Sequence, residues 1–155
     1  MALACSHGAV CVGLSGQVIE VQVHLSNGLP GMTIVGLPDT SISESRDRVR
    51  SAVVNSGFEW PTGRITVGLS PAFEHKRGSG LDLAVAVAVL AGNGAVKQGK
   101  VDGAVFLGEL GLDGSVRPIP GAVAMALGIT RGAGAVVYAG PDPAARVARV
   151  PGLRG

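Results

Sequence analysis

The feature that most constrains the fold is a strict alternation of apolar and polar residues over residues 19–25. The alternating residues are, in order, Ile19, Glu20, Val21, Gln22, Val23, His24 and Leu25. A period of two places every apolar side chain on one face, as in a half-buried strand. Shorter strands are expected at 10–14 and 32–35. The turn signals Ser15-Gly16 and Asn27-Gly28 between them predict an antiparallel meander over the first 36 residues.

Two helices are predicted to cover this sheet. In the first, Ser41 and Glu44 have the spacing of a capping box, and Gly57 is placed to end the helix in the left-handed conformation. Its apolar positions, which share one face, are Ile42, Val49, Ala52 and Val53. The second, at 83–91 after Asp82, has no polar face, so we expect a buried helix, although its Val-Ala alternation also resembles a strand.

The remaining elements complete an α/β pattern. Strands are predicted at 65–69, 105–110, 116–119 and 136–138, and helices at 122–131 and 143–150. This order favours an α/β (α+β) domain with a mixed sheet packed against helices. We expect residues 1–150 to form that domain, with 151–155 as a tail or the start of a linker.

Composition excludes several classes of protein. Hydrophobic residues make up 46% of the 155 residues and charged residues 15%, so we expect a packed core, supplied by aliphatic side chains because aromatics are only 3%. The net charge of +2 is too small to imply nucleic-acid binding by bulk electrostatics. The longest apolar run, 83–91, is far shorter than the ~20 residues of a membrane span. With no signal peptide expected and with Cys5 and Cys11 expected as reduced thiols, the pattern predicts a cytoplasmic protein.

Several stretches resemble one family, the Mg-chelatase-like AAA+ ATPases of the ComM and YifB type. The stretches that carry the resemblance are 26–31, 34–39, 44–52, 55–57, 64–67, Lys76 with Gly78, 82–83, 107–110, Gly114, 117–118 and Gly121. They extend over nearly the whole chain.

The resemblance implies a fold like the Lon protease domain, of the ribosomal-protein-S5-domain-2-like type. It also implies that the domain precedes an AAA+ ATPase module in a homo-oligomeric motor that acts on DNA in recombination during transformation (competence).

No P-loop is present, because the segment Gly78–Asp82 lacks the spacing and the lysine that hold phosphates. The chain ends before any ATPase motif, which suggests a piece of a longer protein. We therefore expect an accessory domain, without cofactor, whose partner is an AAA+ module, with DNA as a further candidate partner.

Ser79 marks where the Lon-like resemblance places a nucleophile. A Ser–Lys dyad needs an amine within hydrogen-bond reach of the hydroxyl. The expected lysine position falls at Ala122 or Val123, neither of which carries an amine. Ser79 is therefore expected to be vestigial and to cap a helix. The alternative is a residual Ser-dependent peptidase.

A basic cluster is the remaining functional candidate. Its members are Arg46, Arg48, Arg50, Lys76 and Arg77. Such side chains contact phosphates in nucleic-acid complexes. The competing interpretation is local pairing of Glu44 with Arg48 and of Asp47 with Arg50, and no aromatic residue is interleaved in the sequence to stack on bases. A stand-alone DNA-binding module therefore stays an alternative to the accessory domain.

No metal site is expected. His7, His24 and His75 are far apart in the sequence and lack paired ligands at metal-site spacing. The alternation around His24 predicts that it lies on the polar face of its strand.

Overall fold

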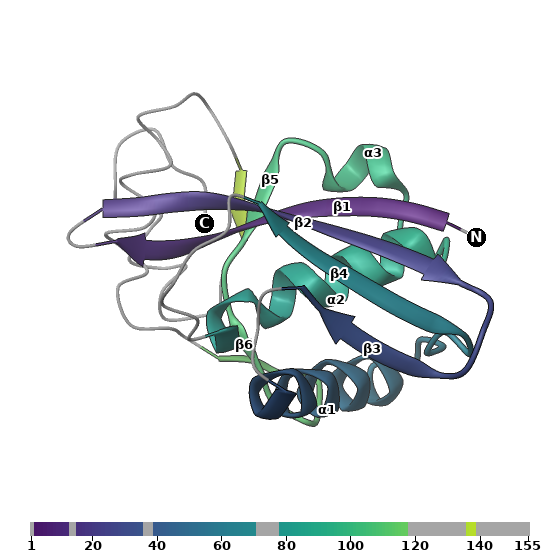
Figure 1. Ribbon diagram of the computed structural model, residues 1–155. Coiled ribbons are helices and arrows are strands. Elements are labelled where there is room, and N and C mark those ends of the chain that lie inside the picture. Colours follow the sequence, from purple (N-terminus) through teal and green to yellow (C-terminus); the bar gives the residue numbers. More distant parts are fainter. Residues whose placement is uncertain (1, 13–14, 36–38, 71–77, 118–135, 139–155) are drawn as a thin grey trace.

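The computed structural model describes residues 2–12, 15–35, 39–70, 78–117 and 136–138. Within these residues a four-stranded sheet packs by one face against two helices, α1 (Asp39–Asn55) and α2 (Asp82–Gly92) (Figure 1). The predicted α/β class is therefore confirmed.

The main sheet is mixed. Its strands are β1 (Ala2–Val12), β2 (Ser15–Ser26), β3 (Gly31–Ile34) and β4 (Arg64–Ser70), in the spatial order β1-β2-β4-β3. β2 pairs antiparallel with both β1 and β4, whereas β3 pairs parallel with β4. β1 and β3 are therefore the two edges of the sheet.

The predicted antiparallel meander over the first 36 residues is wrong in its third strand. β3 does not pair with β2, because β4 lies between them. The chain leaves β3 through α1 and returns as β4, which is the crossover that a parallel pair requires. The predicted turn at Asn27-Gly28 is present, with Gly28 at φ 143°. It leads from β2 to β3, and β4 lies between these two strands in the sheet.

β1 is also longer than the predicted strand at 10–14, since it begins at Ala2 and ends at Val12. Its inward residues Ala4, Ser6 and Gly8 are buried against α2. A Cβ added to Gly8 would lie 2.8 Å from Leu81 Cδ2 and 3.1 Å from Ala84 Cβ. Only small side chains fit on this inward side of β1, and hydropathy alone does not predict such a strand.

The first helix has the predicted end and an earlier start. α1 begins at Asp39, two residues before the predicted cap at Ser41, so that capping box is wrong in position; the side chain of Ser41 lies outside the described residues. Gly57, at φ 88°, has the predicted left-handed conformation after the helix. Val49, Ala52 and Val53 are buried, as predicted for the apolar face.

The second helix is buried, as predicted. α2 follows a 3-10 turn, η1 (Gly78–Leu81), and its buried side chains include those of Ala84, Val85 and Val89. The short helix α3 (Gln98–Val101), which was not predicted from the sequence, follows α2.

The predicted strand at 105–110 is divided into β5 (Ala104–Phe106) and β6 (Glu109–Leu110). The division falls at Gly108, whose amide donates to the Gly80 carbonyl at 3.3 Å and whose carbonyl accepts from the Leu83 amide at 3.2 Å. These bonds join Gly108 to the start of α2 in place of a neighbouring strand.

The other predicted elements of this half are confirmed where the structure describes them. β6 forms a hairpin with β7 (Val116–Arg117) through Gly114 at φ 91°, and β8 (Val136–Tyr138) pairs parallel with β5. Residues 118–119 and the predicted helices at 122–131 and 143–150 lie outside the described residues.

The core is aliphatic, as predicted. Its largest fully buried side chains are Ile19, Val21, Val23, Val49, Ile65, Val67, Val89, Val101, Leu107 and Val137. The alternating residues 19–25 therefore lie in β2, whose inward side chains are at the centre of this core. None of the helices in the described ranges is long and apolar enough to cross a membrane.

Candidate functional site

A largely buried ion pair joins α1 to the start of α2. Arg48 Nε donates to Asp82 Oδ2 at 2.6 Å and Arg48 Nη2 donates to Asp82 Oδ1 at 3.1 Å. The Leu110 amide of β6 adds a third bond to Asp82 Oδ2, at 3.2 Å. The Asp82 side chain is fully buried, while that of Arg48 is 22% exposed. The site ties three elements together at the end of α2 that follows η1.

Burial raises the pKa of the Asp82 carboxyl above its ordinary value of 3.8, and the bonds from Arg48 and Leu110 oppose that rise. The hydrogen bond to Asp82 raises the pKa of the Arg48 guanidinium, which stays charged. The pairings expected for the basic cluster, Glu44 with Arg48 and Asp47 with Arg50, are therefore wrong. Arg48 bonds Asp82, because a bidentate bond to a buried carboxylate outweighs an exposed contact along the helix.

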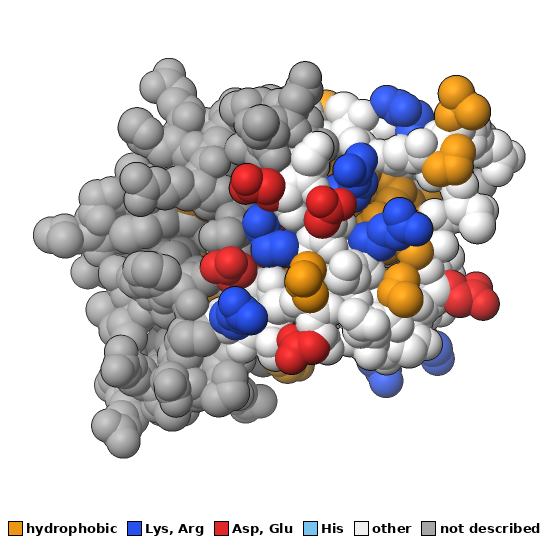
Figure 2. Space-filling view, turned by 90° about the horizontal axis from the view of Figure 1, so that it is seen from below, with side chains coloured by type: hydrophobic (Ala, Val, Ile, Leu, Met, Phe, Trp, Pro, Cys, Tyr) orange, Lys and Arg blue, Asp and Glu red, His pale blue; other side chains and the backbone are white. Residues whose placement is uncertain are grey.

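The arginines on either side of Arg48 line a groove beside α1. The groove has a volume of about 440 Å³ and is lined by Pro30, Gly31, Met32, Arg46, Asp47, Arg50, Trp60, Pro61, Thr62 and Gly63. Figure 2, which views the molecule from the α1 side, shows arginine and lysine side chains beside hydrophobic ones on this face. Arg46 and Arg50, one helical turn apart, are on the same face of α1.

The groove also holds an aromatic side chain that sequence spacing did not place there. Trp60 precedes β4 by only a few residues, and the pairing of Gly31 with Arg64 sets this connector beside the start of β3. Gly63 also lies close against the end of β2, where an added Cβ would be 2.2 Å from the Ser26 carbonyl oxygen. An aromatic residue therefore lies beside the arginines in space, although none is interleaved among them in the sequence.

The charges of the groove are accessible. Arg46 Nε lies 3.5 Å from Asp47 Oδ1, and these side chains are 40% and 68% exposed. Arg50 is exposed and makes no ion pair with any residue that the structure describes. Two arginines, one aspartate and one tryptophan thus line the same groove, a set that can bind a ligand with both an anionic and an aromatic part.

The remaining predicted site residues are not brought together by the described structure. Ser79 lies in η1, and its side chain is outside the described residues. Lys76 and Arg77 of the basic cluster, and Ala122 and Val123 at the expected lysine position, also lie outside them. The vestigial role of Ser79 stays a prediction.

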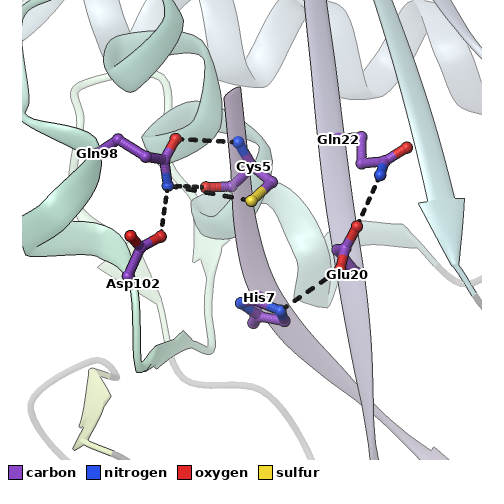
Figure 3. Close-up of polar contacts among 6 residues, drawn as sticks. All are labelled: Cys5, His7, Glu20, Gln22, Gln98 and Asp102. Atoms are coloured by element: carbon purple, nitrogen blue, oxygen red, sulfur yellow. Dashed lines mark hydrogen bonds and ion pairs between the residues drawn. The ribbon is translucent and has the colours of Figure 1, made fainter. Parts of the chain in front are cut away.

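Two of the three histidines, His7 and His24, are among the described residues. His24 is exposed, which confirms its place on the polar face of β2, and His7 Nε2 lies 3.9 Å from Glu20 Oε2 (Figure 3). His75 lies outside the described residues. Within the described ranges, no three His, Cys, Asp or Glu side chains gather as metal ligands.

A glutamine of α3 occupies the outer edge of β1. Gln98 Oε1 accepts from the Cys5 amide at 3.1 Å, and Gln98 Nε2 donates to the Cys5 carbonyl at 2.8 Å (Figure 3). Gln98 Nε2 also donates to Asp102 Oδ1 at 2.9 Å. Burial raises the pKa of the Cys5 thiol, so this cysteine is not activated.

Comparison with known proteins identifies relatives of this chain. Residues 21–139 match the family described as subunit ChlI of Mg-chelatase. The protein YifB of Salmonella typhimurium is 43% identical over 147 residues, which cover 95% of this chain and 29% of that protein. YifB of Escherichia coli is 45% identical over 126 residues, which cover 81% of this chain and 25% of that protein.

A relative with a descriptive name is the competence protein ComM of Haemophilus influenzae. It is 39% identical over 123 residues, covering 79% of this chain and 24% of ComM. The chain thus spans about a quarter of the length of these curated relatives. Because the family match covers most of the chain, this protein belongs to the Mg-chelatase ChlI family, with YifB and ComM among its homologues.

Proposed function

We propose that this chain is a non-catalytic accessory domain of a cytoplasmic ComM/YifB-like AAA+ protein and that its groove beside α1 contacts DNA. The observation that carries the proposal is the groove itself, which Arg46, Arg50 and Trp60 line together. Guanidinium groups bind phosphates, and an exposed indole face can stack on bases.

A catalytic role has less support. The sequence has Ala122 and Val123 where a Lon-like peptidase would carry its lysine base. The carboxylate that follows η1, Asp82, already accepts three hydrogen bonds and is fully buried. Because it is buried and paired with Arg48, this carboxylate is a poor substitute for the missing amine.

Two observations support the accessory role: the family to which the chain belongs, and the greater length of its relatives. Relatives of about four times the aligned length leave room for an AAA+ module in the same polypeptide. One of them is named a competence protein, which is consistent with a part in DNA recombination during transformation. A homo-oligomeric motor would place several copies of this groove around one DNA molecule, so each copy needs only modest affinity.

The experiment is a DNA-binding titration of this chain at low and at moderate salt. We expect binding that weakens with salt, and a marked loss in the double variant R46A/R50A. The matched control is K97A/K100A, which removes the same charge at α3, on the far side of the molecule from α1 (Figure 1). Equal loss in both double variants, or no binding at low salt, would refute the proposal.

The peptidase alternative has its own test. Hydrolysis of an unstructured protein substrate is measured for the chain and for Ser79→Ala. We expect no activity that depends on Ser79. A clear loss in the variant would show that the domain is catalytic.

A further inference from the structure

We infer that the groove beside α1 is a single-strand site, in which one unstacked base lies on the Trp60 indole and the adjoining phosphates lie on Arg46 and Arg50. This inference rests on the proposed function and specifies which form of nucleic acid the site takes and which bases it prefers.

The dimensions of the groove favour one nucleotide unit over a duplex. Its volume of about 440 Å³ lies within the range of small-molecule sites, roughly 300–1,000 Å³. Trp60 is one of the lining residues, so a base can stack on its indole only if the base's own face is free. Bases in a duplex are stacked on one another, whereas those of a single strand can stack on an aromatic side chain.

The indole is held in place before any ligand arrives. Trp60 is only partly exposed, and part of it packs against the core. The Asn93 amide donates to the Glu59 carbonyl at 3.0 Å, which fixes the backbone just before Trp60. A stacking surface that is already ordered costs little conformational entropy on binding.

The two arginines supply the phosphate contacts. Residues four apart on a helix have Cβ atoms about 5–6 Å apart, so Arg46 and Arg50 can bind the same backbone segment. Arg46 is oriented by Asp47 at 3.5 Å, while Arg50 has no such partner among the described residues. We therefore expect Arg50 to give the larger electrostatic contribution.

Asp47 gives the groove a preference among bases. An ionised carboxylate only accepts hydrogen bonds. It can accept from the amino group of cytosine, whereas the O4 edge of thymine offers an acceptor and is repelled. The site should therefore prefer an oligomer of dC to one of dT. An acidic peptide would satisfy the arginines but leave both the indole and Asp47 without a partner.

Trp60 is the only tryptophan in the chain, so its fluorescence reports directly on stacking. We titrate the chain with short oligo-dC, oligo-dT, the corresponding duplex and an acidic peptide. Single-stranded dC should quench the fluorescence and bind roughly fivefold more tightly than dT, as expected for one discriminating hydrogen bond. The duplex should bind with little quenching.

Three variants test the separate contacts. Trp60→Ala, measured with a fluorescently labelled oligo-dC because the variant lacks the single tryptophan, should weaken binding about tenfold. Trp60→Phe, measured in the same way, should retain most of the affinity because it keeps an aromatic face. Asp47→Asn should remove the preference for dC by raising the affinity for dT, because an amide can donate to the thymine O4 as well as accept from cytosine. Lys100→Ala is the control and should change neither affinity nor quenching. Circular dichroism confirms that each variant is folded, and the unsubstituted chain reports stacking even if Trp60→Ala does not fold.

The outcomes separate this inference from the proposed function. DNA binding without quenching, or with equal affinity for duplex and single strand, overturns the single-strand site but leaves the proposed function standing. Quenching by dC and dT with equal affinity overturns the role of Asp47. Absence of DNA binding at low salt, or quenching by the acidic peptide alone, overturns both.

Discussion

Arg48 and Asp82, 34 residues apart in the sequence, form a bidentate ion pair in which the carboxylate is fully buried. The pair fixes α1 against the first residue of α2, and the Leu110 amide joins β6 to the same carboxylate. It therefore positions the start of α2 relative to α1 and β6, although neither residue lines the groove.

Removing the arginine from this pair should destabilise the fold. Arg48→Ala leaves the Asp82 carboxylate buried without its cation, and such a loss costs about 3 kcal/mol. We expect a correspondingly lower free energy of unfolding in urea. Arg46→Ala is the matched control, since its exposed pair with Asp47 is worth less than about 1 kcal/mol. Equal destabilisation by both variants would contradict a structural role for Arg48.

Stability and DNA affinity should be separable within one helix. Arg50→Ala should lower the slope of log K against log salt by about 0.7 for single strands, the value for one phosphate contact, with little change in unfolding. Arg48→Ala should leave that slope unchanged, because its guanidinium is engaged by Asp82. The measurement is a salt titration of oligonucleotide binding for the two variants. A change of slope in Arg48→Ala would show that Arg48 also contacts DNA phosphates.

Gly8 should not tolerate a side chain. A Cβ there would lie 2.8 Å from Leu81 Cδ2 and 3.1 Å from Ala84 Cβ, so Gly8→Ala must displace η1 or α2 and should cost about 1–3 kcal/mol. Gly99→Ala in α3 is the control: nothing lies within 4 Å of its added Cβ, and alanine favours a helix by about 0.5–1 kcal/mol. Thermal unfolding compares the two. A Gly8 variant as stable as the Gly99 variant would disprove the packing.

The β6–β7 turn should loosen in acid. The Ser115 hydroxyl and amide donate to Asp113 Oδ1 at 2.7 and 3.0 Å, and they hold the pKa of that carboxyl below its ordinary value of 3.8. A lowered folded pKa means that the stabilisation is present above pH 3.8 and is lost as the pH falls through the folded value. NMR titration should find the lowered pKa, and Ser115→Ala should return it toward 3.8. A native pKa at or above 3.8 would contradict the assigned bonds.

Elements whose cause is local could be predicted from the sequence. The period of two at Ile19–Leu25, the glycine at 57 and the apolar run in α2 each determine their structure within a few residues, and all three are confirmed. The position of β3 depends instead on which strand lies next to it. That choice is made by packing across the sheet, so the turn signal at Asn27-Gly28 was not enough to decide it.

The candidate site divides in the same way. Arg46 and Arg50 could be found because they lie together on one predicted helix. Trp60 could not, because the backbone pairing of β3 with β4 brings it to the groove. Asp82 was expected only as a helix-start residue, and no local pattern links it to Arg48. A buried acidic residue at the start of an apolar helix is nevertheless a signal that a distant cation should be sought.

The amide of Gln98 has a consequence for how copies of this domain can lie together. It occupies both backbone groups that Cys5 presents at the open side of β1, so an incoming strand would have to displace it first. At the opposite margin, β3 is only four residues long and is preceded directly by Pro30, which has no amide to donate. Intermolecular strand exchange is thus discouraged at both margins. Crowded neighbours can approach one another without fusing into a continuous β-structure.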